Sequence, residues 1–236
     1  MKLLQNCIVV LFIIVFTACS SENTKEIPTA NPVINIKYLA LGDSYTIGQS
    51  VCETCRFPTQ LKDSLQKYLA DNTVVQSRII ALTGWTTSDL KFSLIQQSPT
   101  NDYDLVTLLI GVNNQYQNKP FSLYETDFPD LLNRAITIAK GEKNNVIVIS
   151  IPDYAFTPYG QGSSNPQNIS TEIDMYNLFA EDYCATNNIT FVNITDITRE
   201  GLENPSLVAD DGLHPSKIAY TRFVARILPF AIATLP

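Results

Sequence analysis

The sequence predicts an α/β protein, a three-layer α/β/α sandwich around a five-stranded parallel sheet, flavodoxin-like in kind. Five short apolar runs rich in branched residues alternate with longer segments of helical periodicity. Segments of about ten residues or more are long enough to serve as right-handed crossovers between parallel strands. The apolar runs are nearly continuous, which is typical of strands covered by helices on both faces.

The elements follow in order along the chain. The predicted strands are residues 34–41, 74–82, 103–110, 146–151 and 189–194. The predicted helices are residues 57–70, 86–97, 122–140, 169–186 and 216–228.

Spacing and capping signals justify the helices. In the first helix, apolar side chains recur every four residues, at Phe57, Leu61, Leu65 and Leu69. Thr86 and Thr87 are N-cap candidates for the second helix, which Pro99 ends. The third begins with a possible capping box, Ser122 to Glu125, and ends near Gly141. Residues 152–168 are predicted to form a long, mostly polar loop.

The overall composition is that of a folded, acidic protein. Of the 236 residues, 45% are hydrophobic and 17% are charged, which excludes a disordered chain. The formal net charge is −7, and Lys and Arg form no cluster, so no nucleic-acid partner is expected.

The first residues form a targeting signal. Lys2 is followed by ten apolar residues, 7–16, a run too short to span a bilayer but typical of a signal peptide. The segment Phe16-Thr17-Ala18-Cys19 resembles a bacterial lipoprotein cleavage box, although Phe16 stands where Leu is usual. Ordinary signal-peptidase cleavage, with Cys19 unmodified, is the alternative.

These features predict the domain organisation and the location. Residues 1–18 are the signal peptide, 19–32 a flexible tether, and 33–236 one compact domain. Lipidation at Cys19 would attach the protein to a membrane of the cell envelope by this anchor alone. The oligomeric state stays open.

Small and polar residues follow the predicted strands. Gly42-Asp43-Ser44 follows the first, Gly84 the second, and Gly111-Val112-Asn113 the third; Asp211 and His214 lie beyond the fifth. Ligands of open parallel sheets bind at the carboxyl ends of the strands. We therefore expect these residues to converge at one edge of the sheet.

The set fits acyl transfer. A serine hydroxyl needs a neighbouring base to become a nucleophile, and a carboxylate must hold that base in one tautomer. Ser44 is the candidate nucleophile, His214 the base and Asp211 its orienting carboxylate. The candidate oxyanion hole consists of the Ser44 and Gly84 N–H groups and the Asn113 amide.

These residues resemble the four consensus blocks of the GDSL/SGNH hydrolase family, in the family's order. Tyr45 replaces the usual Leu, and Asn114 replaces the Asp that usually follows the oxyanion Asn. The resemblance implies an esterase, lipase or carbohydrate-ester hydrolase that uses no metal and no cofactor. The favoured substrate is a small-molecule or glycan ester with a short acyl chain.

The same residues allow other interpretations. Each block alone is an ordinary turn or cap. A non-catalytic glycan-binding lipoprotein of the same fold and a lipase or lysophospholipase for longer chains are the alternative functions. The α/β-hydrolase signature G-x-S-x-G is absent from the sequence.

The remaining cysteines and aromatic residues add two expectations. Cys52 and Cys55 are a candidate disulfide, which is favoured over a redox motif or a zinc site, and Cys184 is a buried free thiol. Aromatic residues that follow the strands form a candidate substrate rim or pack loops onto the domain. They are Trp85 and Tyr154, the preferred rim candidates, with Tyr116, Phe156 and Tyr159.

Overall fold

A computed structural model describes residues 32–235 of the chain. The predicted signal peptide, the lipidation site Cys19 and all of the tether except Pro32 lie outside these residues. No helix within the described part is long and apolar enough to cross a membrane.

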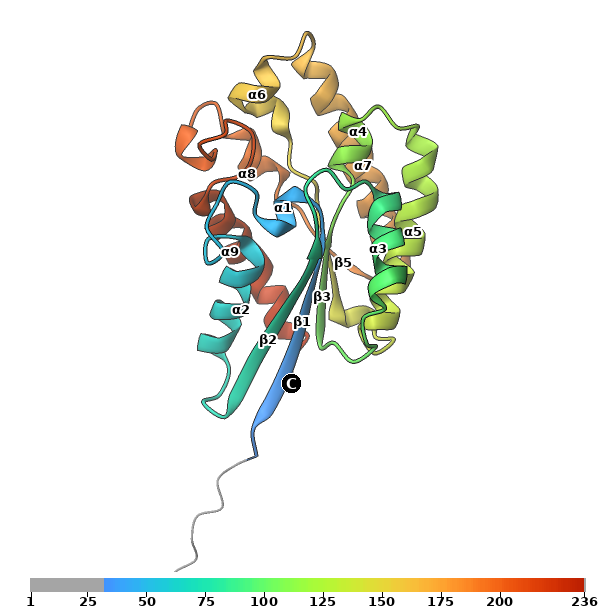
Figure 1. The fold of residues 1–236 in the computed structure, drawn as a ribbon, viewed down its shortest axis with the longest axis vertical. Helices are drawn as coiled ribbons and strands as arrows, with labels where there is room; N and C mark the ends of the chain where they lie inside the picture. Colours follow the sequence, from blue (N-terminus) through green and yellow to red (C-terminus); the bar gives the residue numbers. More distant parts are fainter. Residues whose placement is uncertain (1–31, 236) are drawn as a thin grey trace, which may run out of the picture. The chain divides into compact units, whose positions relative to one another are not determined.

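Five parallel strands form one sheet in the order β2-β1-β3-β4-β5, as predicted (Figure 1). The strands are β1 (Ile34–Gly42), β2 (Thr73–Ala81), β3 (Leu105–Leu109), β4 (Val146–Ile149) and β5 (Thr190–Val192). The central strands β3 and β4 are buried along their whole length, whereas the edge strand β2 is exposed at several positions. Continuous apolar runs therefore mark the strands that helices cover on both faces.

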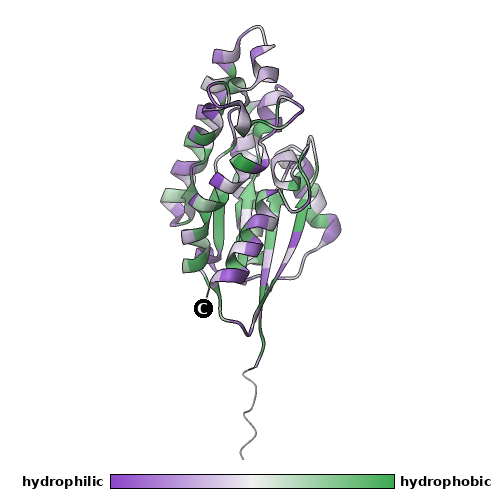
Figure 2. Ribbon diagram, turned by 90° about the vertical axis from the view of Figure 1, so that its left-hand side faces the viewer, coloured by the Kyte–Doolittle hydropathy of each residue, from purple (hydrophilic) through white to green (hydrophobic). Residues whose placement is uncertain are grey.

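Helices cover the sheet on two sides (Figure 1). On one side, α2 (Phe57–Tyr68) packs against α9 (Lys217–Ala233), and α8 (Thr195–Arg199) contacts α9. On the other, α5 (Phe121–Ile138) packs against both α3 (Thr87–Gln97) and α7 (Pro166–Asn187). Figure 2 shows the apolar strands enclosed between these amphipathic layers.

Short elements carry the loops at the carboxyl ends of the strands. They are α1 (Ser44–Ile47), α4 (Val112–Tyr116), α6 (Pro158–Gln161), and the 3-10 helices η1 (Lys143–Asn145), η2 (Tyr154–Phe156) and η3 (Pro205–Leu207). In Figure 1, α1, α4 and α6 lie at the upper end of the sheet.

Two predicted helix boundaries were wrong. Helix α5 begins at Phe121 after Pro120 and has no side-chain cap, so Ser122 lies inside the helix. Helix α9 does not stop at Leu228 but continues through Pro229 to Ala233. Ala231 is fully buried, and its packing keeps the last turn on the core despite the proline.

The predicted loop 152–168 contains η2, α6 and the first residues of α7. Thr157 caps α6 by accepting a hydrogen bond from the Gly160 N–H (3.1 Å), and Asn165 caps α7 by accepting one from the Asn168 N–H (3.1 Å). Each cap directly precedes a proline, which favours the first helical position. These Thr-Pro and Asn-Pro pairs were the sequence signal for the missed helices.

Candidate active site

The candidate site lies where the strand order reverses. The chain passes from β1 outward to β2 and then returns to β3 on the other side of β1. Ser44 follows β1, and Asn113 follows the neighbouring strand β3. Such a switch point leaves a crevice between the diverging loops, which is where open α/β sheets bind ligands.

The turn before Ser44 requires a glycine. A Cβ atom on Gly42 would lie 2.1 Å from Thr46 Oγ1 and 2.3 Å from the Leu109 carbonyl oxygen. The buried Asp43 then caps α1 by accepting a hydrogen bond from the Tyr45 N–H (3.0 Å). Ser44 is therefore fixed at the first position of a short helix, directly above β1.

Asp43 is an unusual cap because it is completely buried. This burial raises the pKa of its carboxyl to about 7. Among the described residues, its Oδ2 atom has no hydrogen-bond partner. A cap that is uncharged over part of the physiological pH range therefore supports Ser44.

His214 and Asp211 lie on one hairpin-like loop. Its base is closed by hydrogen bonds from the Ala209 N–H to the His214 carbonyl oxygen (2.7 Å) and from the Ser216 N–H to the Leu207 carbonyl oxygen (2.8 Å). His214 Nδ1 lies 2.6 Å from Asp211 Oδ2. This contact leaves Nε2 as the imidazole nitrogen that is free to face Ser44.

Four donors hold the Asp211 carboxylate. Its Oδ1 atom accepts the Leu213 and His214 N–H groups at 3.0 Å each, and its Oδ2 atom accepts the Ser50 hydroxyl at 2.6 Å as well as His214 Nδ1. Partial burial alone would raise the pKa of Asp211, but these hydrogen bonds hold it well below its usual range. The carboxylate is therefore charged at neutral pH and can orient the imidazole.

Asn113 is fixed by the loop that carries Gly84. Its Nδ2 atom donates to the Trp85 carbonyl oxygen at 3.0 Å, and the same amide acts on the buried Asp43 carboxyl, whose pKa it lowers. Gln117 Nε2 donates to the Gly84 carbonyl oxygen at 2.8 Å. Gly84 has a φ of +86°, and its N–H donates to no other described residue. The N–H of Gly84 is thus available to a substrate oxygen, and the Asn113 side chain lines the same cavity.

Asn114 joins helices instead of facing the site. Its Oδ1 accepts the Thr87 N–H at 2.9 Å, and its Nδ2 donates to Thr87 Oγ1 at 2.8 Å. Thr87 in turn donates to Asp127, which also pairs with Lys91. The residue that departs from the family's usual Asp therefore ties α4 to α3 and α5.

Ser44 and His214 share one cavity of about 200 Å³. Its walls include the predicted residues Gly84, Asn113 and Tyr154, together with Tyr45, Thr83, Val112, Tyr116, Tyr159 and Leu213. The described residues contain no hydrogen bond between Ser44 and His214, which meet as walls of this cavity. Catalytic contacts of this kind often tighten only when a substrate binds.

Of the two roles that the sequence left open for Trp85, its position in the structure fits packing. Its side chain does not line this cavity but is half buried against the core, and only its carbonyl oxygen contributes, by holding Asn113. Phe156 is likewise packed inward, with the Arg199 guanidinium 6.0 Å from its ring centroid. Both rings pack against the core. Tyr116, Tyr154 and Tyr159 instead line the cavity that contains Ser44.

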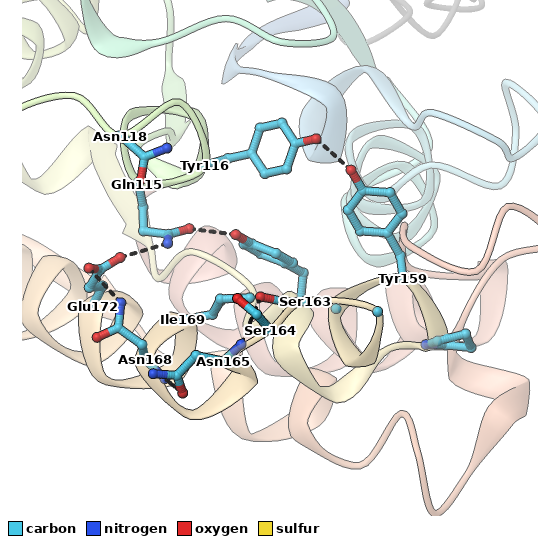
Figure 3. Close-up of a pocket in the computed structure, with 14 residues that line it drawn as sticks. Gln115, Tyr116, Asn118, Tyr159, Ser163, Ser164, Asn165, Asn168, Ile169 and Glu172 are labelled. Carbon is cyan, nitrogen blue, oxygen red and sulfur yellow. Dashed lines mark hydrogen bonds between the residues drawn. The ribbon is translucent and has the colours of Figure 1, made fainter.

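A second, larger cavity of about 720 Å³ adjoins the first along these three tyrosines. Figure 3 shows Tyr116 and Tyr159 pointing toward one another, with their hydroxyl oxygens 2.5 Å apart. Below them, Gln115 joins the Tyr154 hydroxyl (2.8 Å) to the Glu172 carboxylate (2.7 Å). The remaining walls are mostly polar, with Asn118, Ser163, Ser164, Asn165 and Asn168.

Sequence reasoning missed several residues of the site. Ser50 contacts Asp211 across 161 positions of the chain, and Gln115 joins Tyr154 to Glu172. No local signal marks these partners, because the contacts exist only after folding. In the described chain, no group of three or more His, Cys, Asp or Glu side chains is placed to hold a metal ion.

Residues 40–222 match the GDSL-like Lipase/Acylhydrolase family, a segment that includes the loops described above. The chain belongs to this family. No curated protein matches its sequence.

Solved structures of three other proteins have the same fold. The acetylxylan esterase Axe2 from Geobacillus stearothermophilus is 19% identical, with a TM-score of 0.61, and the match covers 84% of this chain and 95% of Axe2. The lipase/acylhydrolase from Enterococcus faecalis is 20% identical, with a TM-score of 0.63, and the match covers 85% and 97% of the two chains. A lipolytic G-D-S-L protein from Veillonella parvula is 15% identical, with a TM-score of 0.61 and coverage of 82% and 97%.

This GDSL-family protein is a carboxylic ester hydrolase. The fold and the family are the ones that the sequence predicted, and the sheet is that of an SGNH hydrolase.

Proposed function

We propose that the protein is a serine esterase that removes short acyl groups, with acetyl esters of carbohydrates as the preferred class. Ser44 attacks the ester carbonyl carbon, and His214 Nε2 takes the serine proton. Asp211 holds the imidazole through Nδ1 and stabilises the imidazolium that forms. The observation that carries this proposal is the shared cavity of Ser44, His214, Gly84 and Asn113.

The roles follow from the donors around the cavity. The Asn113 amide and the N–H groups of Gly84 and Ser44 meet the negative charge that develops on the carbonyl oxygen. His214 then returns the proton to the alcohol oxygen, and the alcohol leaves. Water attacks the acyl-serine in the same way, with His214 again acting as base.

The sizes of the two cavities support a short acyl group on a polar alcohol. The cavity at Ser44 is small and largely aromatic, which suits a short acyl group. The adjoining cavity offers tyrosine rings together with amide, hydroxyl and carboxylate groups, and sugars bind to such a mixture by stacking and hydrogen bonding. Axe2, an acetylxylan esterase, has the same fold.

A fluorophosphonate probe and a chromogenic acetyl ester test the assignment. The wild type should hydrolyse the ester and carry the probe on Ser44. Ser44→Ala should lose both activities and unfold at the wild-type urea concentration, because the change removes only one oxygen. Probe labelling that persists in the variant would assign the nucleophile to another serine. Labelling without turnover of any ester in an acetylated-glycan panel would favour a binding protein.

We further propose that lipidation at Cys19 anchors the enzyme to a membrane of the cell envelope, facing the periplasm or the exterior. The support is the sequence of residues 1–21. In detergent phase partitioning, full-length wild type from a bacterial host should enter the detergent phase, and Cys19→Ser should lose this acyl-dependent partitioning. Recovery of the wild type in the aqueous phase would contradict lipidation.

A further inference from the structure

A disulfide-closed loop connects the nucleophile helix to helix α2. Cys52 and Cys55 are joined by a disulfide, and the loop begins at Gly48, one turn after Ser44. The N–H groups of Gly48 and Gln49 both donate to the Ser44 carbonyl oxygen at 3.0 Å. The start of the loop is therefore hydrogen-bonded to the backbone of Ser44.

Ser50 in this loop reaches the opposite side of the site. Its hydroxyl donates to Asp211 Oδ2 at 2.6 Å, the same oxygen that contacts His214 Nδ1. Ser50 has a φ of +64°, a left-handed conformation that a residue other than glycine adopts only when its surroundings impose it.

Little packing holds the loop against the His214 loop. A surface cleft of about 460 Å³ lies between them, with Ser50, Cys52 and Cys55 on one wall and Asp210 and Lys217 on the other. Cys52 is exposed, and it contacts Thr54 within its own loop (3.2 Å). The position of the loop therefore depends on Val51, which packs against the core, on a few hydrogen bonds and on the disulfide.

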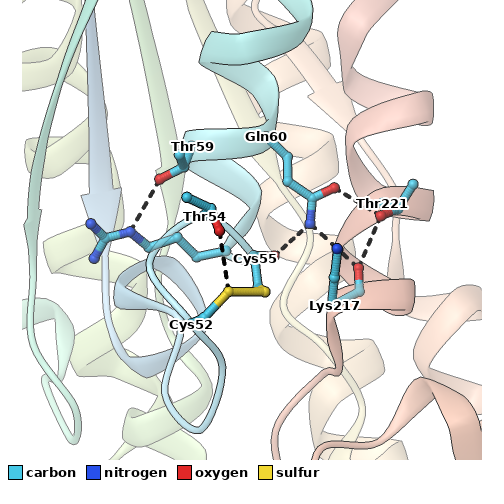
Figure 4. The surroundings of a disulfide bond; sticks show 8 residues. Cys52, Thr54, Cys55, Thr59, Gln60, Lys217 and Thr221 are labelled. Carbon is cyan, nitrogen blue, oxygen red and sulfur yellow. Dashed lines mark hydrogen bonds between the residues drawn. A yellow bond between two sulfur atoms is a disulfide. The ribbon is translucent and has the colours of Figure 1, made fainter.

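The other end of the loop is tied to helix α9. Gln60 Nε2 donates to the Cys55 carbonyl oxygen at 2.5 Å, and Gln60 Oε1 accepts the Thr221 hydroxyl at 2.8 Å (Figure 4). Helix α9 begins at Lys217, three residues after His214. The loop that contains the disulfide thus links helix α1, which carries Ser44, to helix α9, which follows His214.

We propose that Ser50 is a positioning residue for the Asp211–His214 pair and that the Cys52–Cys55 disulfide holds Ser50 in place, which makes the esterase sensitive to reduction. This inference rests on the proposed roles of His214 and Asp211. A dithiol reductant breaks the Sγ–Sγ bond: both cysteines end as thiols, and the dithiol is oxidised to a disulfide. The loop then loses its closure, and Ser50 leaves Asp211 Oδ2.

Ser50 should affect catalysis because its hydrogen bond limits the rotation of the Asp211 carboxylate. Two backbone N–H groups donate to Oδ1 of Asp211. Its Oδ2 atom, which contacts His214 Nδ1, accepts one further hydrogen bond, from the Ser50 hydroxyl, and without Ser50 a water molecule would take that place. A hydrogen bond to a charged group contributes more than one between neutral groups, so loss of this donor loosens the imidazole. Because Asp211 is partly exposed, water replaces part of the interaction. We expect kcat to fall by about 3- to 10-fold, with KM nearly unchanged.

The chain offers a direct readout, since His214 is its only histidine. In untagged ¹⁵N-labelled protein at pH 8, the imidazole nitrogen shifts report which nitrogen carries the proton. In the wild type we expect one tautomer, with the proton on Nδ1. In Ser50→Ala we expect a mixture of the two tautomers. A mixture in a fully folded variant separates positioning from a general loss of structure.

Matched variants separate the effect of losing the Ser50 hydroxyl from the effect of changing the backbone conformation at this position. Ser50→Gly also removes the hydroxyl but suits the left-handed conformation, so it should lose as much activity as Ser50→Ala. Thr100→Ala removes a hydroxyl that donates to another exposed aspartate, Asp102 (2.6 Å), outside the loop and the site, and should behave as wild type. A single tautomer and wild-type kcat in both Ser50 variants would overturn the role of Ser50.

Reduction tests the disulfide. Dithiothreitol-treated wild type, and Cys52→Ser combined with Cys55→Ser, should show the tautomer mixture and kcat loss of Ser50→Ala. Adding Ser50→Ala to the disulfide-free variant should cause no further loss. A reduced enzyme with a single tautomer and full activity would show that the disulfide does not hold Ser50. The tautomer readout needs no turnover, so it stands apart from any failure of the proposed esterase activity.

Discussion

At the scale of single residues, the buried carboxyl of Asp43 makes the stability of the turn before Ser44 depend on pH. Its pKa of about 7 in the folded protein lies above the usual value, so between about pH 4 and 7 the native state holds a proton that the unfolded chain releases. Stability from this group is therefore present at low pH and is lost as the pH rises through 7. Asp211, whose pKa is lowered, acts in the opposite direction and only below about pH 4.

Asp43→Asn tests this linkage. The amide oxygen can still cap α1, but the side chain no longer titrates. The free energy of unfolding of the wild type should fall by about 3 kcal/mol more than that of the variant between pH 5 and 8, at about 1.4 kcal/mol per pKa unit. Urea unfolding at four pH values measures it. Parallel profiles for the two proteins would contradict the raised pKa.

Asn113 should act on the transition state more than on substrate binding. Asn113→Ala removes one of the proposed oxyanion donors, and loss of such a donor costs about 10²- to 10³-fold in kcat. KM should change less, because the charge on the oxygen develops only as the bond to Ser44 forms. Steady-state kinetics with an acetyl ester measures both constants, and unchanged kcat would place Asn113 outside the oxyanion hole.

At the scale of elements, one buried network joins three helices. Asn114 on α4 presents an acceptor and a donor to Thr87 on α3, and the Thr87 hydroxyl donates to Asp127 on α5 at 3.0 Å. Asn114 is fully buried and uses both polar atoms of its amide. The amide is therefore matched to its partners in a way that a carboxylate would not be.

Asn114→Asp, which introduces the family's usual residue, should destabilise this protein. A carboxylate accepts the Thr87 N–H but has no donor for Thr87 Oγ1, and it places a second negative charge near Asp127. We expect a loss of about 1–3 kcal/mol at pH 8 and a smaller loss at pH 5, where the new carboxyl is partly protonated. Thermal unfolding at the two pH values provides the test. Stability equal to wild type at pH 8 would show that the network accommodates either side chain.

At the scale of the whole molecule, the two cavities lie side by side, and we expect this arrangement to set the preference for the substrate. The tyrosines between them place polar groups directly beyond the space at Ser44. A long acyl chain gains about 0.8 kcal/mol for each methylene that it buries in an apolar trench. A chain that extended into the polar cavity would instead cover Gln115 and Glu172 without satisfying them.

We therefore expect kcat/KM to be higher for acetyl, propionyl and butyryl esters than for chains of ten or more carbons. A p-nitrophenyl ester series below the micelle concentration measures this preference. Gln115→Leu, which makes the polar cavity more apolar, should reduce the difference in kcat/KM between short-chain and long-chain esters. Faster turnover of long-chain esters by the wild type would favour a lipase or lysophospholipase.

Much of the site could be read from the sequence because local chemistry fixes it. The turn at Gly42 requires a residue without a Cβ atom, and the Asp211 side chain caps its own loop two and three positions on. Apolar runs alternate with amphipathic helices along the chain. A parallel sheet between two helix layers buries the strands and the apolar faces of the helices, so this arrangement could be predicted. Strand ends in such a sheet share one edge, so Ser44, Gly84 and Asn113 had to approach one another.

Only the tertiary structure decided which side chains complete the site. Trp85 and Tyr154 looked alike in the sequence, yet the ring of Trp85 packs on the core and Tyr154 lines both cavities. Ser50 meets Asp211 because two loops far apart in the chain fold over the same strand ends. Periodicity and capping describe neighbours along the chain, and contacts across the fold depend on how complete layers pack, which no short segment encodes.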